Sequence, residues 1–88
     1  MIDVIIVEDE YLAREHIKRC IDWNELDCRI SGEAPNGEDA LELIRVLRPQ
    51  LAIVDINMPF INGLEFSRIV HDKQPEIKII ILTGYGRF

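Results

Sequence analysis

Three short runs of this chain are apolar almost without a break, and they restrict its fold more than any other feature of the sequence. The runs are MIDVIIV at residues 1–7, LAIV at 51–54 and IKIIIL at 77–82. A strand with one face in water alternates apolar and polar residues, whereas a strand covered on both faces reads as a continuous apolar run. These runs therefore predict buried strands of a parallel sheet, with helices on both of its faces.

The segments between the runs have helical spacing. Two sets of apolar residues recur as on one face of a helix: Ala13, Ile17, Cys20 and Ile21, and Ala40, Leu41, Ile44 and Leu47. The first helix is expected to end near residue 21. The second is expected to end before Pro49, because proline lacks the amide hydrogen that a helix interior needs. A weaker strand is expected between them, at residues 28–34.

Two asparagines mark helix starts. Asn36 has Asp39 three residues later, and Asn62 has Glu65 at the same spacing. The side-chain oxygen of an asparagine at this position can accept a hydrogen bond from the free backbone N–H three residues on. A second helix is therefore expected from residue 37, and a third from residue 63 to about residue 72.

The elements alternate from strand to helix throughout, which is typical of an α/β domain with a doubly wound parallel sheet. The 88 residues allow one domain, at residues 1–88. In such sheets, ligands bind beyond the carboxyl ends of the strands. The residues that directly follow the strands are therefore the candidates for a functional site.

Charge and composition exclude several classes of protein. The net charge of −6 argues against direct contact with nucleic acid, because binding to phosphates needs clustered lysines and arginines. No apolar run approaches the roughly 20 residues of a membrane span, and early acidic residues argue against a signal peptide. Cys20 and Cys28 have no second pair with which to bind zinc, so they are expected to be reduced thiols. A cytoplasmic protein without a membrane segment is predicted.

Polar residues of one chemical kind follow the apolar runs. Glu8 and Asp9 come after the first run, Asp55 after the second and Thr83 after the last. If these strands are neighbours, the side chains meet at one edge of the sheet. Three carboxylates would repel one another there, and Mg²⁺, which prefers oxygen ligands, would remove the conflict. Asp55 would then be a metal ligand and a nucleophile, since carboxylates form aspartyl phosphates. The hydroxyl of Thr83 could donate to a phosphoryl oxygen.

Each of these residues also has an ordinary structural explanation. An acidic residue after a strand is usually a turn residue or a helix cap, and Thr83 alone reads as a strand end. The combination favours a site, because the polar residues follow three different strands of one sheet.

Three segments combine these features: IIVEDE, LAIVDINMPFING and IIILTGYG. Together they resemble the first strand, the phosphoacceptor segment and the fourth strand of a response-regulator receiver domain of a two-component system. The stretches CIDWNELDCRISGEAPNGEDALELI and TGYGRF are also similar to one subgroup of that family. Receivers of this subgroup are joined to an AraC-type helix-turn-helix domain.

The resemblance implies a flavodoxin-like sheet with the strand order 2-1-3-4 and a role for each site residue. Asp55 would be phosphorylated, and Thr83 would be the switch hydroxyl. Asp9 and Asp55 would bind Mg²⁺, with Glu8 assisting and the backbone carbonyl of Asn57 as a further ligand. The chain would be a signalling module rather than an enzyme. Its partners would be a sensor histidine kinase and an AraC-type DNA-binding domain in the parent protein.

The chain also departs from the family pattern. Phe60 stands where glycine is frequent and would place a large apolar group beside the site. The family's fifth strand, its last two helices and its phosphate-pairing lysine are missing, so the receiver is expected to be incomplete at its C-terminus. Lys73 and Lys78 cannot replace this lysine, because they would lie at the amino-terminal end of the fourth strand, opposite to the site. Residues 77–82 would form an apolar edge strand, which predicts a homodimer or larger assembly.

Two other functions compete with phosphoryl signalling. A phosphatase of the haloacid-dehalogenase type also uses an aspartate at a strand end and Mg²⁺. Its Asp-x-Asp motif lies on the first strand, however, whereas Asp55 is on the third and is followed by Asn57. The other alternative is an interaction module that never carries phosphate, which would not need the missing lysine.

Overall fold

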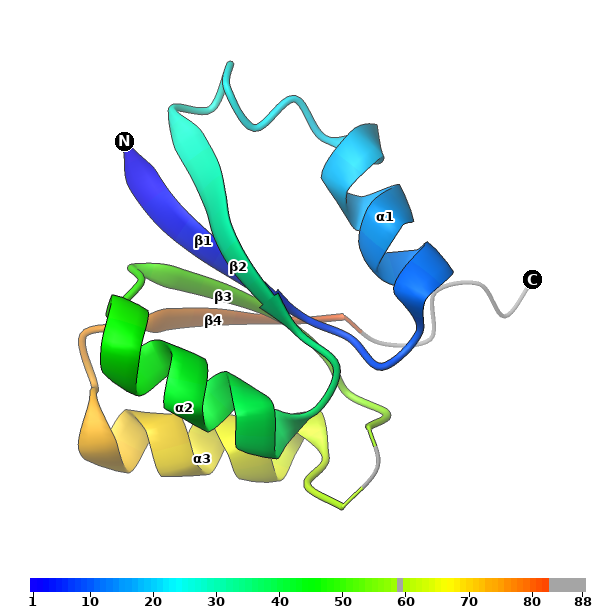
Figure 1. Ribbon diagram of the computed structural model, residues 1–88. Helices are drawn as coiled ribbons and strands as arrows, with labels where there is room; N and C mark the ends of the chain where they lie inside the picture. Colours follow the sequence, from blue (N-terminus) through cyan, green and yellow to red (C-terminus); the bar gives the residue numbers. More distant parts are fainter. Residues whose placement is uncertain (59, 83–88) are drawn as a thin grey trace.

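The computed structural model describes residues 1–58 and 60–82, which form a four-stranded sheet with helices on both faces (Figure 1). The strands are β1 (Ile2–Val7), β2 (Cys28–Ala34), β3 (Leu51–Asp55) and β4 (Lys78–Leu82). The helices are α1 (Tyr11–Cys20), α2 (Gly37–Leu47) and α3 (Gly63–Lys73). The strands lie in the order β2-β1-β3-β4, and each pairing is parallel. The α/β class and the order 2-1-3-4 predicted from the sequence are confirmed.

Every limit expected from the sequence lies within one residue of the observed one; the start of α1, at Tyr11, was not predicted. The difference that matters for function is at β3, which includes Asp55 as its last residue instead of ending before it. Asp55 is paired with Leu82 of β4. The backbone that carries this carboxylate is therefore part of the sheet.

Both expected helix caps are present. The Oδ1 atom of Asn36 accepts a hydrogen bond from the backbone N–H of Asp39 at 2.7 Å, at the start of α2. The Oδ1 atom of Asn62 accepts one from the N–H of Glu65 at 2.9 Å, at the start of α3. These bonds fix where the two helices begin relative to the strand ends that precede them. In the part of the chain that the structure describes, no helix is long and apolar enough to span a membrane.

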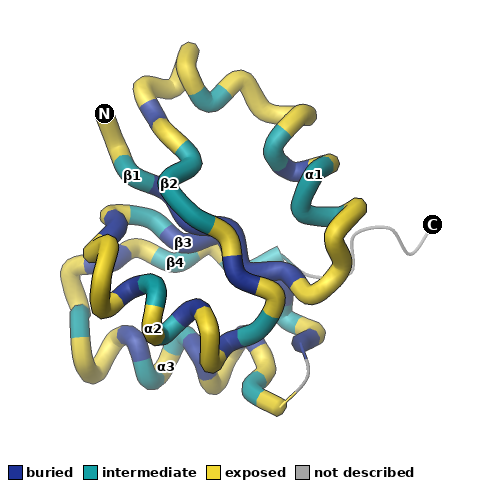
Figure 2. Tube along the Cα trace, in the orientation of Figure 1, coloured by how far each residue is buried: buried dark blue, intermediate teal, exposed yellow. Residues whose placement is uncertain are grey.

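The main core lies between the sheet and the pair α2 and α3 (Figure 2). Phe66 and Val70 of α3 and Ala40 and Ile44 of α2 pack against inward-facing residues of the central strands. Phe66 is completely buried. This face of the sheet is therefore covered by two helices (Figure 1).

The opposite face carries α1, and no other helix covers it in the described ranges (Figure 1). Ile17 is the one buried residue of α1, while Cys20 and Ile21 of the expected apolar stripe are exposed. A smaller cluster built on Val4 and Ile53 lies on this face. One helix of roughly 10 Å diameter cannot cover this face completely, because four strands about 4.8 Å apart form a wider surface.

β4 forms one edge of the sheet in the described residues. Its side chains are exposed or half-buried, and Ile80 is 49% exposed. The apolar edge expected from the sequence is thus present in this part of the chain, and association of chains through it stays a prediction. Lys78 is paired with Leu51 at the start of β3, whereas Leu82 is paired with Asp55 at its end. The expectation that Lys78 lies away from the carboxyl ends of the strands is confirmed.

Candidate metal centre

Three carboxylates meet at the carboxyl ends of β1 and β3. The register of the two parallel strands pairs Val7 with Val54, so the next residue on each strand, Glu8 and Asp55, reaches the same edge of the sheet. The structure brings oxygen atoms of Glu8, Asp9 and Asp55 to within 4.8 Å of one another. The predicted meeting of these three side chains is therefore observed.

The three carboxylates differ in exposure. Glu8 is 1% exposed and Asp55 is 9% exposed, whereas Asp9 lies in water. The Oε2 atom of Glu8 accepts a hydrogen bond from the backbone N–H of Glu10 at 2.8 Å. The Oδ1 atom of Asp55 accepts one from the N–H of Asn57 at 3.2 Å. Each buried carboxylate is thus oriented by the backbone N–H of the residue two positions later in the chain.

The electrostatics of the cluster favour a cation. A hydrogen bond with the carboxyl of Glu8, followed by partial desolvation and then by the charge of Glu8, raises the pKa of Asp9 above its ordinary value. A raised carboxyl pKa means that the ionised form is disfavoured where it lies. Three oxygen-rich ligand groups converging on an exposed side are the donor set that Mg²⁺ takes while keeping several waters. The residues present therefore fit a hard divalent cation.

The match to known proteins agrees with this geometry. The family model of the response regulator receiver domain matches residues 4–87, nearly the whole chain. The chain belongs to the response regulator receiver domain family.

Similar proteins of known sequence are bacterial regulators. The response regulator GacA of Pseudomonas aeruginosa is 40% identical over 83 residues, which are 94% of this receiver domain and 38% of GacA. YesN of Bacillus subtilis, called an uncharacterized transcriptional regulatory protein, is 32% identical over 88 residues, which are 24% of its length. The receiver domain thus spans less than half the length of these relatives.

Solved structures support the same fold. The REC domain of AraT, a response regulator from Geobacillus stearothermophilus, is 39% identical with a TM-score of 0.88, over 99% of this receiver domain and 67% of that chain. A two component transcriptional regulator AraC from Clostridium phytofermentans is 25% identical with a TM-score of 0.88, over 99% of this receiver domain and 70% of that chain.

The remaining predicted site residues are placed less completely. Asn57 follows β3 and is exposed, and its backbone N–H binds Asp55. The role of its carbonyl as a metal ligand stays a prediction. Thr83 lies outside the described residues, so the switch hydroxyl also stays a prediction.

Phe60 of the receiver domain has an unusual backbone and a free side chain. Its φ angle is 69°, in the left-handed region, and its side chain is 93% exposed. It borders a small hollow of about 160 Å³ whose other walls are Asn36, Glu38 and Asp39. A side chain this exposed does not pack over the carboxylates, although Phe60 lies in the loop between β3 and α3 that follows Asp55.

Two residues contact the backbone of this site in ways that the sequence patterns did not reveal. Arg14 reads as part of the polar side of α1, but its guanidinium reaches the backbone carbonyl of Glu8. Gly63 is part of the phosphoacceptor motif, but the need for glycine there appears only in space. A Cβ atom on Gly63 would lie 2.8 Å from the carbonyl oxygen of Asp55.

In metal-free buffer at neutral pH, the Asp9→Asn variant should be more stable than the wild-type chain. Because the pKa of Asp9 is raised on folding, its contribution to stability is present below the unfolded value of 3.8 and is lost as the pH rises through the folded pKa. The side chain of asparagine does not ionise, so its contribution to stability does not change over this pH range. Urea unfolding in a chelator should show wild type and variant converging at acid pH and separating towards neutrality.

Addition of Mg²⁺ should reverse this order, because a ligand that binds only the folded state stabilises it, and Asp9→Asn removes one of the carboxylates expected to bind the ion. A variant that is less stable than wild type at neutral pH without metal would contradict the proposed repulsion.

Proposed function

We propose that this receiver domain accepts a phosphoryl group on Asp55, with Mg²⁺ held by Glu8, Asp9, Asp55 and the backbone carbonyl of Asn57. The observation that supports this most strongly is the convergence of three carboxylates within 4.8 Å at adjacent strand ends. When bound, Mg²⁺ would neutralise the charge of the phosphoryl oxygens and of the carboxylates around them.

The chain's own residues supply the nucleophile and its orientation. An oxygen of Asp55 attacks the phosphorus atom, so an O–P bond forms while the bond from phosphorus to the donor breaks. The leaving group of the donor keeps the electron pair of that bond. The sheet fixes the backbone of Asp55, and the N–H of Asn57 holds its Oδ1 atom. We propose that the hydroxyl of Thr83 donates a hydrogen bond to an oxygen of the transferred phosphoryl group.

The partners follow from the family and its relatives. A sensor histidine kinase is the proposed phosphodonor, and an AraC-type DNA-binding domain is the proposed output in the parent protein. The likeness to regulators named AraT and AraC supports this output. A net charge of −6 makes direct binding of this segment to DNA unfavourable. We propose that the protein acts in the cytoplasm, as a signalling module rather than as an enzyme.

A phosphate-independent interaction module is the alternative, and one observation favours it. Lys18 is paired with Glu15 and Glu33, Lys73 ends α3, and Lys78 begins β4 at the far end of the sheet. Thus none of the lysines in the part described here is placed to neutralise a phosphoryl group on Asp55.

Labelling by a small phosphodonor separates the two functions. The chain is incubated with acetyl phosphate and MgCl₂, and its intact mass is measured against a sample containing a chelator. Uptake of one phosphoryl group that depends on Mg²⁺ is expected. Failure to take up a phosphoryl group, and failure to bind beryllofluoride with Mg²⁺, would favour the interaction module. Hydrolysis of a phosphomonoester would instead indicate a phosphatase.

A further inference from the structure

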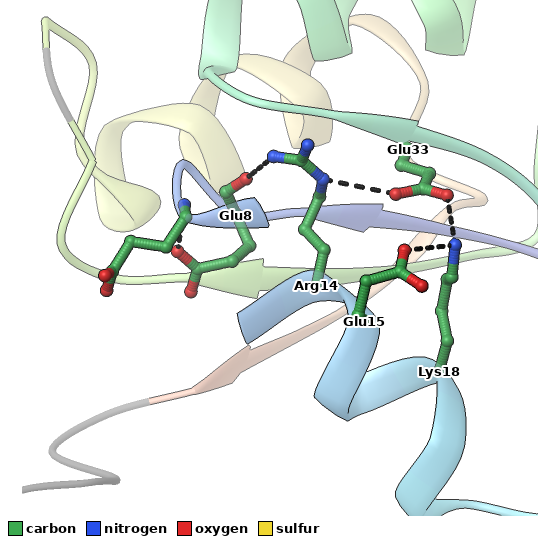
Figure 3. A network of polar contacts seen from close by, with 6 residues as sticks. Glu8, Arg14, Glu15, Lys18 and Glu33 are labelled. Atoms are coloured by element: carbon green, nitrogen blue, oxygen red, sulfur yellow. Dashed lines mark hydrogen bonds and ion pairs between the residues drawn. The ribbon is translucent and has the colours of Figure 1, made fainter. Parts of the chain in front are cut away.

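The turn that carries Asp9 is held on both sides. The Nη1 atom of Arg14 donates to the backbone carbonyl of Glu8 at 2.7 Å, which fixes the peptide unit before Asp9 (Figure 3). The carboxylate of Glu8 accepts from the N–H of Glu10 at 2.8 Å, which fixes the peptide unit after Asp9. Two hydrogen bonds therefore hold the backbone on either side of Asp9, and one of them comes from the side chain of Arg14.

Arg14 is itself held in place by its neighbours. Its Nε atom donates to Oε1 of Glu33 on β2 at 3.1 Å, and Lys18 binds the other oxygen of Glu33 at 2.6 Å (Figure 3). Lys18 also contacts Glu15 at 2.7 Å. The side chain of Arg14 is only 16% exposed, and its guanidinium carbon lies 5.7 Å from the centre of the Tyr11 ring. A guanidinium with partners on several sides has few other conformations.

The ion pair between Lys18 and Glu33 persists at neutral pH. Hydrogen bonds to Glu15 and Glu33 raise the pKa of Lys18 to about 12. The hydrogen bond from Lys18, with a smaller contribution from Arg14, lowers the pKa of Glu33. Lys18 and Glu33 therefore keep their charges at neutral pH.

We propose that Arg14 is a positioning residue of the metal centre: its bond to the Glu8 carbonyl sets the direction in which Asp9 presents its carboxylate towards Asp55. The inference rests on the proposed binding of Mg²⁺ at this edge. Arg14 does not touch the metal in this account. It acts through the backbone of the residue before a ligand, and residues that orient metal ligands often affect affinity strongly.

The charge of Arg14 would act in the opposite direction. A cation near the carboxylates repels Mg²⁺, so removal of the charge alone would tighten binding. Arg14 and Lys18 are balanced by the carboxylates of Glu33 and Glu15, so the four charges of this group sum to zero and offset one another's field. Water at the exposed side and salt, with a Debye length of about 8 Å at physiological ionic strength, screen the rest. The orienting effect is therefore expected to dominate, and the sign of the change in affinity separates the two effects.

The test is the dissociation constant for MgCl₂, measured by calorimetry on the folded 88-residue chain. Arg14→Ala should weaken Mg²⁺ binding by about tenfold, the lower end of the range for residues that orient metal ligands. Arg14→Lys should weaken it nearly as much, because a single ammonium cannot reproduce the two directed bonds of the guanidinium. Lysine keeps the positive charge and favours a helix. The Mg²⁺ affinity of Arg14→Lys therefore tests the positioning role even if Arg14→Ala unfolds.

Arg45→Ala is the charge-matched control. Arg45 pairs with Glu42 on the exposed surface of α2, so its loss changes the net charge equally and leaves the turn intact. Its Mg²⁺ affinity should equal that of the wild-type chain. The unfolding midpoint without metal is measured for all variants, since a residue that only braced α1 would lower this midpoint and leave the affinity of folded molecules unchanged.

The outcomes separate this inference from the proposed function. Equal or tighter Mg²⁺ binding by Arg14→Ala and Arg14→Lys, with wild-type binding intact, would overturn the positioning role alone. Absence of Mg²⁺ binding by the wild-type chain would overturn the proposed metal centre as well.

Discussion

Replacement of Asp55 by asparagine should abolish phosphorylation of the chain by acetyl phosphate and Mg²⁺. An amide oxygen is a poor nucleophile and bears no full negative charge, so it cannot displace the donor's leaving group as a carboxylate does. Asn57 can still donate to the amide oxygen at this position, so the fold should be retained. Intact-mass measurement after incubation should show no added phosphoryl group on the variant.

The matched control for this variant is Asp72→Asn. Asp72 is exposed near the far end of α3, so the change in charge is the same and the carboxylate cluster is untouched. Phosphoryl uptake should equal that of the wild-type chain. Uptake by Asp55→Asn at the wild-type level would show that another carboxylate, such as Asp9, is the acceptor.

The Gly63→Ala variant should be less stable than the Gly37→Ala variant by about 1–3 kcal/mol, the usual cost of inserting an atom into a packed region. Its Cβ would lie 2.8 Å from the carbonyl oxygen of Asp55 and 2.8 Å from the Cα atom of Ile56. Both are backbone atoms, so no side chain can rotate to make room. The end of β3 or the start of α3 has to move, and the unfolding midpoint in urea measures the cost.

Gly37→Ala is the control, because Gly37 opens α2 as Gly63 opens α3. Its Cβ would meet the Cβ atom of Ile61 at 3.2 Å, and that side chain can shift slightly. Alanine also favours a helix over glycine by about 1 kcal/mol, so Gly37→Ala should have little net effect. Equal stabilities of the two variants would contradict the close approach of α3 to the end of β3.

Mg²⁺ affinity extends the test of Gly63. Movement of the Asp55 backbone would separate its carboxylate from those of Glu8 and Asp9. The folded Gly63→Ala chain should therefore bind Mg²⁺ more weakly than Gly37→Ala. Equal affinities would show that the backbone adjusts on the α3 side alone.

The sequence by itself determined the secondary structure, the class of fold and the members of the acid cluster. Helical and strand periodicities are local, so the alternation of apolar runs and amphipathic segments was sufficient to find every described element and to place the predicted limits within one residue. The caps at Asn36 and Asn62 are also local, since donor and acceptor are three residues apart. Glu8, Asp9 and Asp55 could be grouped because parallel strands bring the residues after them to one edge.

Only the tertiary structure decided how this edge is built. The pairing of Val7 with Val54 places Glu8 beside Asp55, and a strand pattern does not contain its register. The bond from Arg14 to the Glu8 carbonyl and the approach of Gly63 to Asp55 join a side chain or a Cα atom to a distant backbone atom. Such contacts depend on how helices dock against the sheet, and this docking is determined by the packing of the whole core rather than by any local pattern.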